Sequence, residues 1–89
     1  MWIELWEKKW NKKYEYTETN LKLRSNEKYD KVIEFLNGFE PIIEFKTVPN
    51  YRRMSERINV FTENWIISID CTIKQLFKLE EELELLMVE

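Results

Sequence analysis

The sequence predicts a small α+β domain in which a mostly antiparallel sheet packs with two helices, at about residues 26–37 and 72–88. Two segments repeat apolar residues at helical spacing, and the shorter segments around them alternate β-branched with polar residues. The chain has 89 residues, of which 44% are apolar and 15% aromatic. We therefore expect a single domain, residues 1–89, with one modest core.

The first predicted helix covers about residues 26–37. Ser25-Asn26 offers an N-cap, and Glu27 and Asp30 place negative charge in the first turn, where the helix dipole favours it. Gly38 is expected to end the helix. The residues expected to form its apolar face are Tyr29, Val32, Ile33 and Leu36.

A strand is predicted directly after this helix. Pro41 blocks helix continuation, and residues 42–48 are rich in β-branched side chains. Pro49-Asn50 is expected to turn the chain. Residues 51–57 are predicted to form a polar connection that holds at most one helical turn.

Residues 58–73 allow two interpretations. Apolar and polar residues alternate on both sides of Glu63-Asn64, which predicts a hairpin of two strands with its turn there. A continuous helix is the alternative, and it is disfavoured because isoleucine and threonine are poor helix formers. Cys71 lies in this stretch and is expected to be a small buried hydrophobe.

The last predicted helix covers about residues 72–88. Its leucines recur at spacings of three and four, and four glutamates between residues 80 and 84 occupy the other side. The repeat covers barely two heptads, so we expect the helix to pack on the domain's own sheet. Pairing with a second copy or with a partner helix is the alternative. The leucines concerned are Leu76, Leu79, Leu83 and Leu86.

The N-terminal segment fits either a helix or a strand. Trp2, Trp6, Trp10 and Tyr14 recur every four residues, which makes a stripe along a helix, and all have even numbers, which puts them on one side of a strand. Residues 13–24 favour extended chain, with a hairpin bend near Thr19-Asn20.

The composition excludes several classes of chemistry. The chain has no histidine, one cysteine and one glycine. These counts exclude Ser-His and Cys-His nucleophile pairs. They also exclude metal sites built from imidazole or from four thiolates, and Gly-rich phosphate loops. Catalysis by carboxylates alone stays formally open, although no pair among the 17 Asp and Glu stands out. We predict no catalytic residue, no metal and no cofactor, and we expect a protein that is not an enzyme.

Composition also bears on location and origin. No apolar run reaches the length of a membrane helix, and the first residues are too charged for a signal peptide. A single thiol fits a cytoplasmic protein. The chain lacks alanine and is poor in glycine, as expected from an AT-rich genome, such as that of a phage whose proteins work in the host cytoplasm.

Tryptophan is enriched where proteins meet, and three tryptophans lie in one short segment. We therefore expect a protein-binding module, such as a phage-type inhibitor or adaptor that docks on a larger host protein. Self-association through the C-terminal helix is compatible with this function. The candidate anchors are Trp2, Trp6 and Trp10, or the helix face of Leu76, Leu79, Leu83 and Leu86.

Nucleic-acid binding is the alternative function. Aromatic residues alternate with lysines near the N-terminus, as in proteins that stack bases beside phosphate-binding cations. Glutamates run through the same segment, and the net charge is −3, so this function ranks second. Its candidate residues are Lys8, Lys9, Lys12 and Lys13, together with Arg52 and Arg53.

Overall fold

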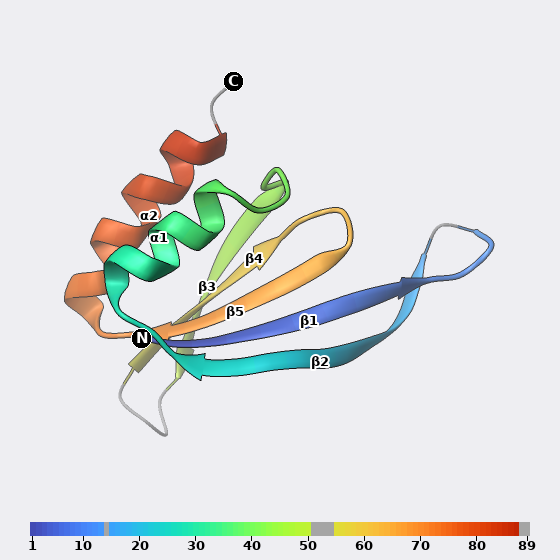
Figure 1. Ribbon diagram of the computed structural model, residues 1–89, viewed down its shortest axis with the longest axis horizontal. Coiled ribbons are helices and arrows are strands. Elements are labelled where there is room, and N and C mark those ends of the chain that lie inside the picture. The colour runs from blue at the N-terminus through green and yellow to red at the C-terminus, as the bar shows by residue number, and fades with distance from the viewer. Residues whose placement is uncertain (14, 51–54, 88–89) are drawn as a thin grey trace.

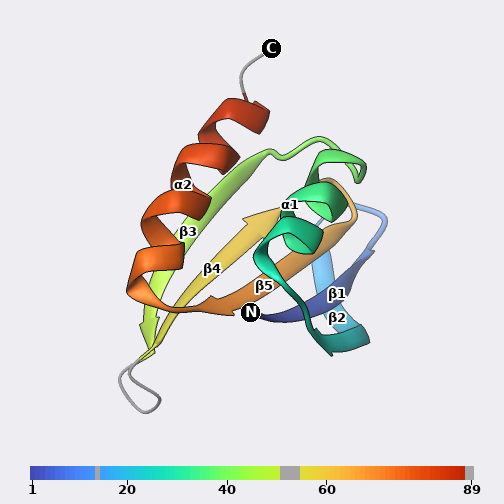
Figure 2. The ribbon, with the colours of Figure 1, turned by 60° about the vertical axis from the view of Figure 1, so that its left-hand side comes forward.

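The chain forms a five-stranded antiparallel sheet in the order β2-β1-β5-β4-β3, and both helices cover the same face of it (Figures 1 and 2). The computed structural model describes residues 1–13, 15–50 and 55–87. The elements are β1 (Trp2–Trp10), β2 (Tyr16–Asn26), α1 (Tyr29–Asn37), β3 (Glu44–Asn50), β4 (Ser55–Phe61), β5 (Trp65–Cys71) and α2 (Ile73–Met87). This architecture confirms the predicted α+β class.

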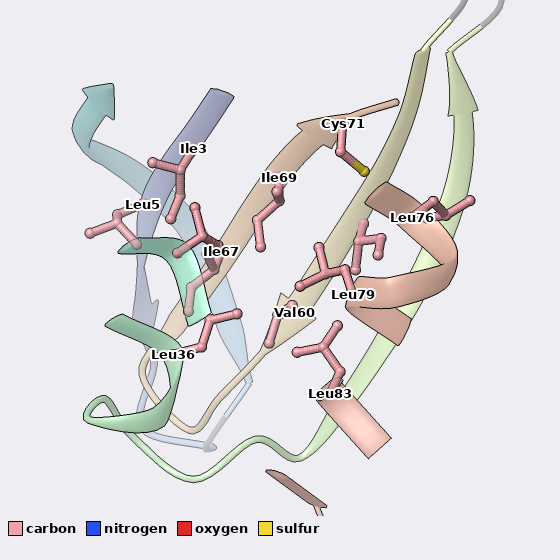
Figure 3. Packing of buried hydrophobic residues seen from close by; sticks show 12 residues of the cluster. Ile3, Leu5, Leu36, Val60, Ile67, Ile69, Cys71, Leu76, Leu79 and Leu83 are labelled. Carbon is pink, nitrogen blue, oxygen red and sulfur yellow. The ribbon is translucent and has the colours of Figure 1, made fainter. Parts of the chain in front are cut away.

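The core lies between the helices and the facing side of the sheet (Figure 3). Alternate residues of the central strands β4 and β5 point toward the helices and are fully buried, and so are residues of both helices. The fully buried apolar residues are Ile58, Val60, Ile67, Ile69, Val32, Leu79 and Leu83. The same alternation directs the intervening strand residues to the opposite face, which no helix covers in the described part of the chain.

The predicted C-terminal helix is confirmed, because α2 runs from Ile73 to Met87 and packs on the sheet. Gly38 ends α1 as expected. The predicted start of α1 was wrong, because Ser25 and Asn26 belong to β2 and the N-cap residue is Lys28. Backbone pairing of Ile3 with Ser25 and of Trp2 with Asn26 keeps this segment extended, so long-range pairing overrides the local capping signal.

The hairpin predicted within residues 58–73 is confirmed, with Glu63 and Asn64 between β4 and β5. The turn predicted at Pro49-Asn50 was wrong, because both residues continue β3 and pair with β4. β3 is an edge strand, where a sheet tolerates proline. Residues 55–57, predicted as a polar connection, belong to β4. Residues 51–54 lie outside the described part.

The N-terminal segment is a strand and not a helix. It pairs with β2 on one side and with β5 on the other. The bend predicted at Thr19-Asn20 was wrong, since both residues lie within β2. The chain reverses earlier, where the Asn11 side-chain oxygen accepts hydrogen bonds from the backbone N–H groups of Lys13 and Glu15. Tyr14 lies outside the described residues.

Glu40 joins the α1–β3 connection to the turn between β4 and β5. Its carboxylate accepts hydrogen bonds from the Thr62 hydroxyl at 2.7 Å, from the Asn64 backbone N–H at 3.2 Å and from the Asn64 side-chain amide at 2.9 Å. Partial burial raises the pKa of Glu40, but these hydrogen bonds and the Lys8 charge outweigh it and hold the pKa below the ordinary 4.5.

Replacement of Glu40 by glutamine should therefore destabilise the fold in a pH-dependent way. A carboxyl group whose pKa is lowered by folding stabilises the protein above its unfolded pKa and loses that effect as the pH falls through the folded pKa. We expect Glu40→Gln to lower the free energy of unfolding by on the order of 1 kcal/mol at pH 7. The difference in unfolding free energy between Glu40→Gln and wild type should become smaller below pH 4.5, and urea denaturation measures it. An equal difference at pH 7 and pH 3 would contradict this assignment.

Because one side of α2 faces the core, replacing leucine by alanine should affect stability differently on the two sides of the helix. Leu79 is fully buried, so Leu79→Ala should cost about 2–5 kcal/mol of unfolding free energy. Leu85 is 69% exposed on the same helix, and Leu85→Ala should change the stability by less than about 0.5 kcal/mol. Chemical denaturation of both variants measures the contrast. Similar losses would place the core face elsewhere on α2.

Candidate functional site

The face of the sheet opposite the helices, called the open face below, collects the aromatic residues of β1. Strand pairing places residues of all five strands side by side on it. Its members are Trp2, Glu4, Trp6, Lys8 and Trp10 of β1; Tyr16, Thr19, Leu21 and Arg24 of β2; Ile66, Ser68 and Asp70 of β5; Arg57, Asn59 and Phe61 of β4; and Glu44, Lys46 and Val48 of β3.

Glu4 lies between two tryptophans of β1 on this face. It is 8% exposed, and its two carboxylate oxygens accept hydrogen bonds from the indole N–H of Trp2 at 3.1 Å and of Trp6 at 3.2 Å. The Arg24 guanidinium on β2 lies 3.7 Å from the carboxylate. A buried carboxylate needs such partners, and here they also fix the orientation of both indole rings.

A second aromatic group lies farther along β1. The Lys8 ammonium is 5.6–5.8 Å from the ring centres of Trp10, Tyr16 and Phe61 and donates a hydrogen bond to the Thr62 carbonyl. Partial burial lowers the pKa of Lys8, against the attraction of Glu40 and Glu44. Trp10 is 44% exposed. This group therefore presents aromatic surface around a cation that already has partners.

The other polar residues of the open face are largely paired with one another. Arg57 donates two hydrogen bonds to Asp70, at 2.8 and 3.1 Å, and they raise the pKa of Arg57. The Ser68 hydroxyl donates to the Asn59 side-chain oxygen at 2.9 Å. Because these groups satisfy each other, covering them with another surface leaves few polar groups without a partner.

The structure brings together the predicted anchors Trp2, Trp6 and Trp10, and it separates them from the predicted leucine face. Trp2 and Trp10 are exposed and Trp6 is half-buried. The leucines lie on the other side of the sheet: Leu76, Leu79 and Leu83 are buried in the core, and Leu86 is half-buried against it. These four leucines pack α2 against the sheet.

Sequence reasoning missed Glu4 and Phe61 as part of this surface. Glu4 has an even residue number, as the tryptophans of β1 do, so it lies on the same side of the strand. This was the available signal once a strand was assumed. Phe61 comes from another strand. Its proximity depends on the pairing register, which no local pattern in the sequence reveals.

The lysines of the nucleic-acid alternative do not gather on one face. Lys8 lies on the open face, whereas Lys9 points to the opposite side and forms an ion pair with Glu18 at 2.8 Å. Lys12 and Lys13 lie in the turn between β1 and β2. Arg52 and Arg53 lie outside the described residues. No continuous basic surface forms among the candidates that the structure describes.

A small apolar hollow lies beside β2 on the helix side of the sheet. It has a volume of about 220 Å³ and is lined mainly by apolar side chains, including Leu5, Leu23 and Phe35. This volume is below the roughly 300–1,000 Å³ of typical ligand pockets. A larger hollow of about 680 Å³ is bordered by Trp2, Asp70 and Ile73 and lies open at the surface.

Cys71 is buried at the helix-facing side of β5. Burial, followed by the nearby Asp70 and Glu56 charges, raises the pKa of its thiol to about 11. This environment fits the predicted role as a small buried hydrophobe. Among the described residues, no group of three or more His, Cys, Asp or Glu is arranged to hold a metal ion. No described helix has the length and apolarity needed to cross a membrane.

Comparison of the chain with protein-family models, with curated proteins and with solved structures gave no match.

The arrangement around Glu4 predicts that its charge organises the tryptophans. In Glu4→Gln, an NH2 donor replaces one of the two carboxylate oxygens, so one of the two indole N–H groups faces a donor and not an acceptor. We expect a loss of about 1–3 kcal/mol of unfolding free energy and an altered near-ultraviolet circular dichroism spectrum, because the ring orientations change. Glu7→Gln is the matched control, since Glu7 pairs only with exposed Lys22 on the opposite side. An unchanged spectrum in Glu4→Gln would mean that the carboxylate does not position the rings.

Proposed function

We propose that this chain is a non-enzymatic protein-binding module whose open face docks on a larger protein, as an inhibitor or an adaptor does. The supporting observation is that three tryptophans of one strand share this face, with Trp2 36% and Trp10 44% exposed. Large aromatic residues dominate the binding energy of protein interfaces when a partner covers them. That such a module is encoded by a phage and works in the host cytoplasm stays a prediction from composition.

The way the rings are held supports binding by a preformed surface. Ile3 and Leu5 are buried in the core, so the β1 segment that carries Glu4 is fixed between β2 and β5. The Glu4 carboxylate then holds the indoles of Trp2 and Trp6. Side chains that are ordered before binding lose less conformational entropy when a partner covers them.

The length of the aromatic strip indicates the kind of partner. Trp2 and Trp10 are eight residues apart on one strand, which corresponds to about 26 Å at the usual rise of a strand. The far end of the β1–β2 hairpin extends beyond the other strands (Figure 1). A strip of this length suits a flat or gently curved protein surface and is too long for one small molecule.

Removal of the exposed rings should abolish partner binding without unfolding the chain. We expect Trp2→Ala combined with Trp10→Ala to lose a protein that the wild type retains from lysate of the source organism, with affinity reduced about 100-fold or more. Trp6 is not replaced in this variant, because it is half-buried against Glu4. Quantitative affinity capture and circular dichroism measure binding and folding.

The matched control removes exposed apolar side chains from the other side of the molecule. Leu23→Ala combined with Ile43→Ala removes side chains that are 46% and 61% exposed and that lie outside the open face and outside α2. This control should retain the partner. Equal loss of the partner in both double variants would contradict docking through the open face.

The same proteins test the nucleic-acid alternative. Stacking of bases on Trp10 should quench tryptophan fluorescence, and the affinity should fall steeply with salt. We expect no quenching by single-stranded oligonucleotides at low salt, because Lys8 has partners in the fold and Lys9 faces the other side. Salt-sensitive quenching that is lost in the double tryptophan variant would replace the proposed function by nucleic-acid binding.

A further inference from the structure

The outer side of α2 carries an apolar stripe that the core does not use. Ile73, Phe77, Glu81 and Leu85 follow each other at intervals of four residues. The three apolar members are 55%, 63% and 69% exposed, respectively, whereas Leu76, Leu79 and Leu83 on the inner side are buried. Figure 2 shows α2 along one outer flank of the molecule, on the helix side of the sheet. Phe77 and Leu85 of this stripe lie apart from the open face, whereas Ile73 borders a hollow that Trp2 also lines.

Charges are distributed unevenly along the same helix. The first half carries Lys74 and Lys78 and no acidic residue, and the second half carries four glutamates and no basic residue. This order opposes the helix dipole, which favours acidic residues near the N-terminus and basic residues near the C-terminus. In an isolated helix this order of charges is unfavourable at both ends. A partner with acidic residues beside the first half and basic residues beside the second half would therefore stabilise the helix.

We propose that a second copy of this chain docks on the outer stripe of α2, with the two helices antiparallel. Antiparallel pairing centred near Phe77 overlaps the two helices over residues 73–81, so the basic start of each helix lies against Glu80 and Glu81 of the other, and the two helix dipoles oppose each other. A two-fold axis makes both halves of the contact identical, as in most homodimers. Phe77 then packs against Phe77 of the partner subunit close to the axis.

One charge pair follows directly from this geometry. With the axis near Phe77, Lys74 of one copy lies beside the partner's Glu81. Both side chains are exposed, and neither forms an ion pair with the residues that the structure describes. They are seven residues apart, about 10 Å along one helix, so they do not pair within one chain. Lys78 is less available, since its ammonium lies 4.8 Å from the centre of the Tyr29 ring.

Reversal of the two charges tests the pairing directly. By sedimentation velocity, the wild type at high protein concentration should show twice the monomer mass of 11.1 kDa. Lys74→Glu alone and Glu81→Lys alone each place like charges together twice in the dimer. Each should raise the dimer dissociation constant about tenfold or more. An equimolar mixture of the two variants should associate at least as tightly as the wild type, because every such pair is then attractive.

Two further variants separate pairing from folding. Phe77→Ser removes an exposed ring and should abolish the dimer while circular dichroism shows an intact fold. Reversal of the exposed Lys31–Glu34 pair of α1 (Lys31→Glu with Glu34→Lys) is the matched control and should leave the dissociation constant unchanged. A monomeric wild type at millimolar concentration, or single variants that do not associate on mixing, overturns the proposal. The double tryptophan variant of the open face should dimerise normally, so the two surfaces are tested independently.

Discussion

The coverage of the sheet on one side is the constraint on which the rest of the structure depends. Two helices of 9 and 15 residues cover one face of five strands, and the described chain has no further element for the other face. Antiparallel sheets accept this arrangement only when the second face tolerates water. In this protein the second face carries large side chains whose hydrogen bonds and ion pairs form within β1 and between neighbouring strands. The core and the open face therefore both result from the alternation of side chains between the two sides of each strand.

Glu4 shows how the two faces depend on each other. Its neighbours Ile3 and Leu5 are buried beneath the helices, so β1 has little freedom to shift. The alternation along β1 places the carboxylate between the indole N–H groups of Trp2 and Trp6, where it is shielded from water. A single slip of register would place the carboxylate in the core and the isoleucine in water. The cost of that slip stabilises the observed register, and with it the aromatic strip.

Local patterns were sufficient to predict the elements whose contacts lie within them. The helical spacing of Leu76, Leu79 and Leu83 indicated α2, and the alternation around Glu63-Asn64 indicated the β4–β5 hairpin. The wrong predictions concern segments whose conformation is set by pairing with strands that are distant in the sequence. Asn26 carries a capping signal, yet it pairs with Trp2 across the sheet, and Pro49 carries a turn signal, yet it continues an edge strand. The tryptophans of β1 could be named from the sequence. The carboxylate that orients them lies two residues from each of Trp2 and Trp6, and its role follows only once this segment is known to be a strand and not a helix.

The two surfaces lie on opposite sides of the sheet, and this has a consequence for how tightly a partner can be held. α2 belongs to the helix side, and the tryptophans belong to the open face. The proposed dimer through α2 would leave both open faces free, so it would present two copies of the proposed binding surface. Against a partner with two equivalent sites, the second contact becomes intramolecular and the apparent affinity exceeds that of either contact alone. Against a partner with one site, dimerisation adds nothing. The charge order along α2 would then bear on binding only when the partner itself is repeated or symmetric.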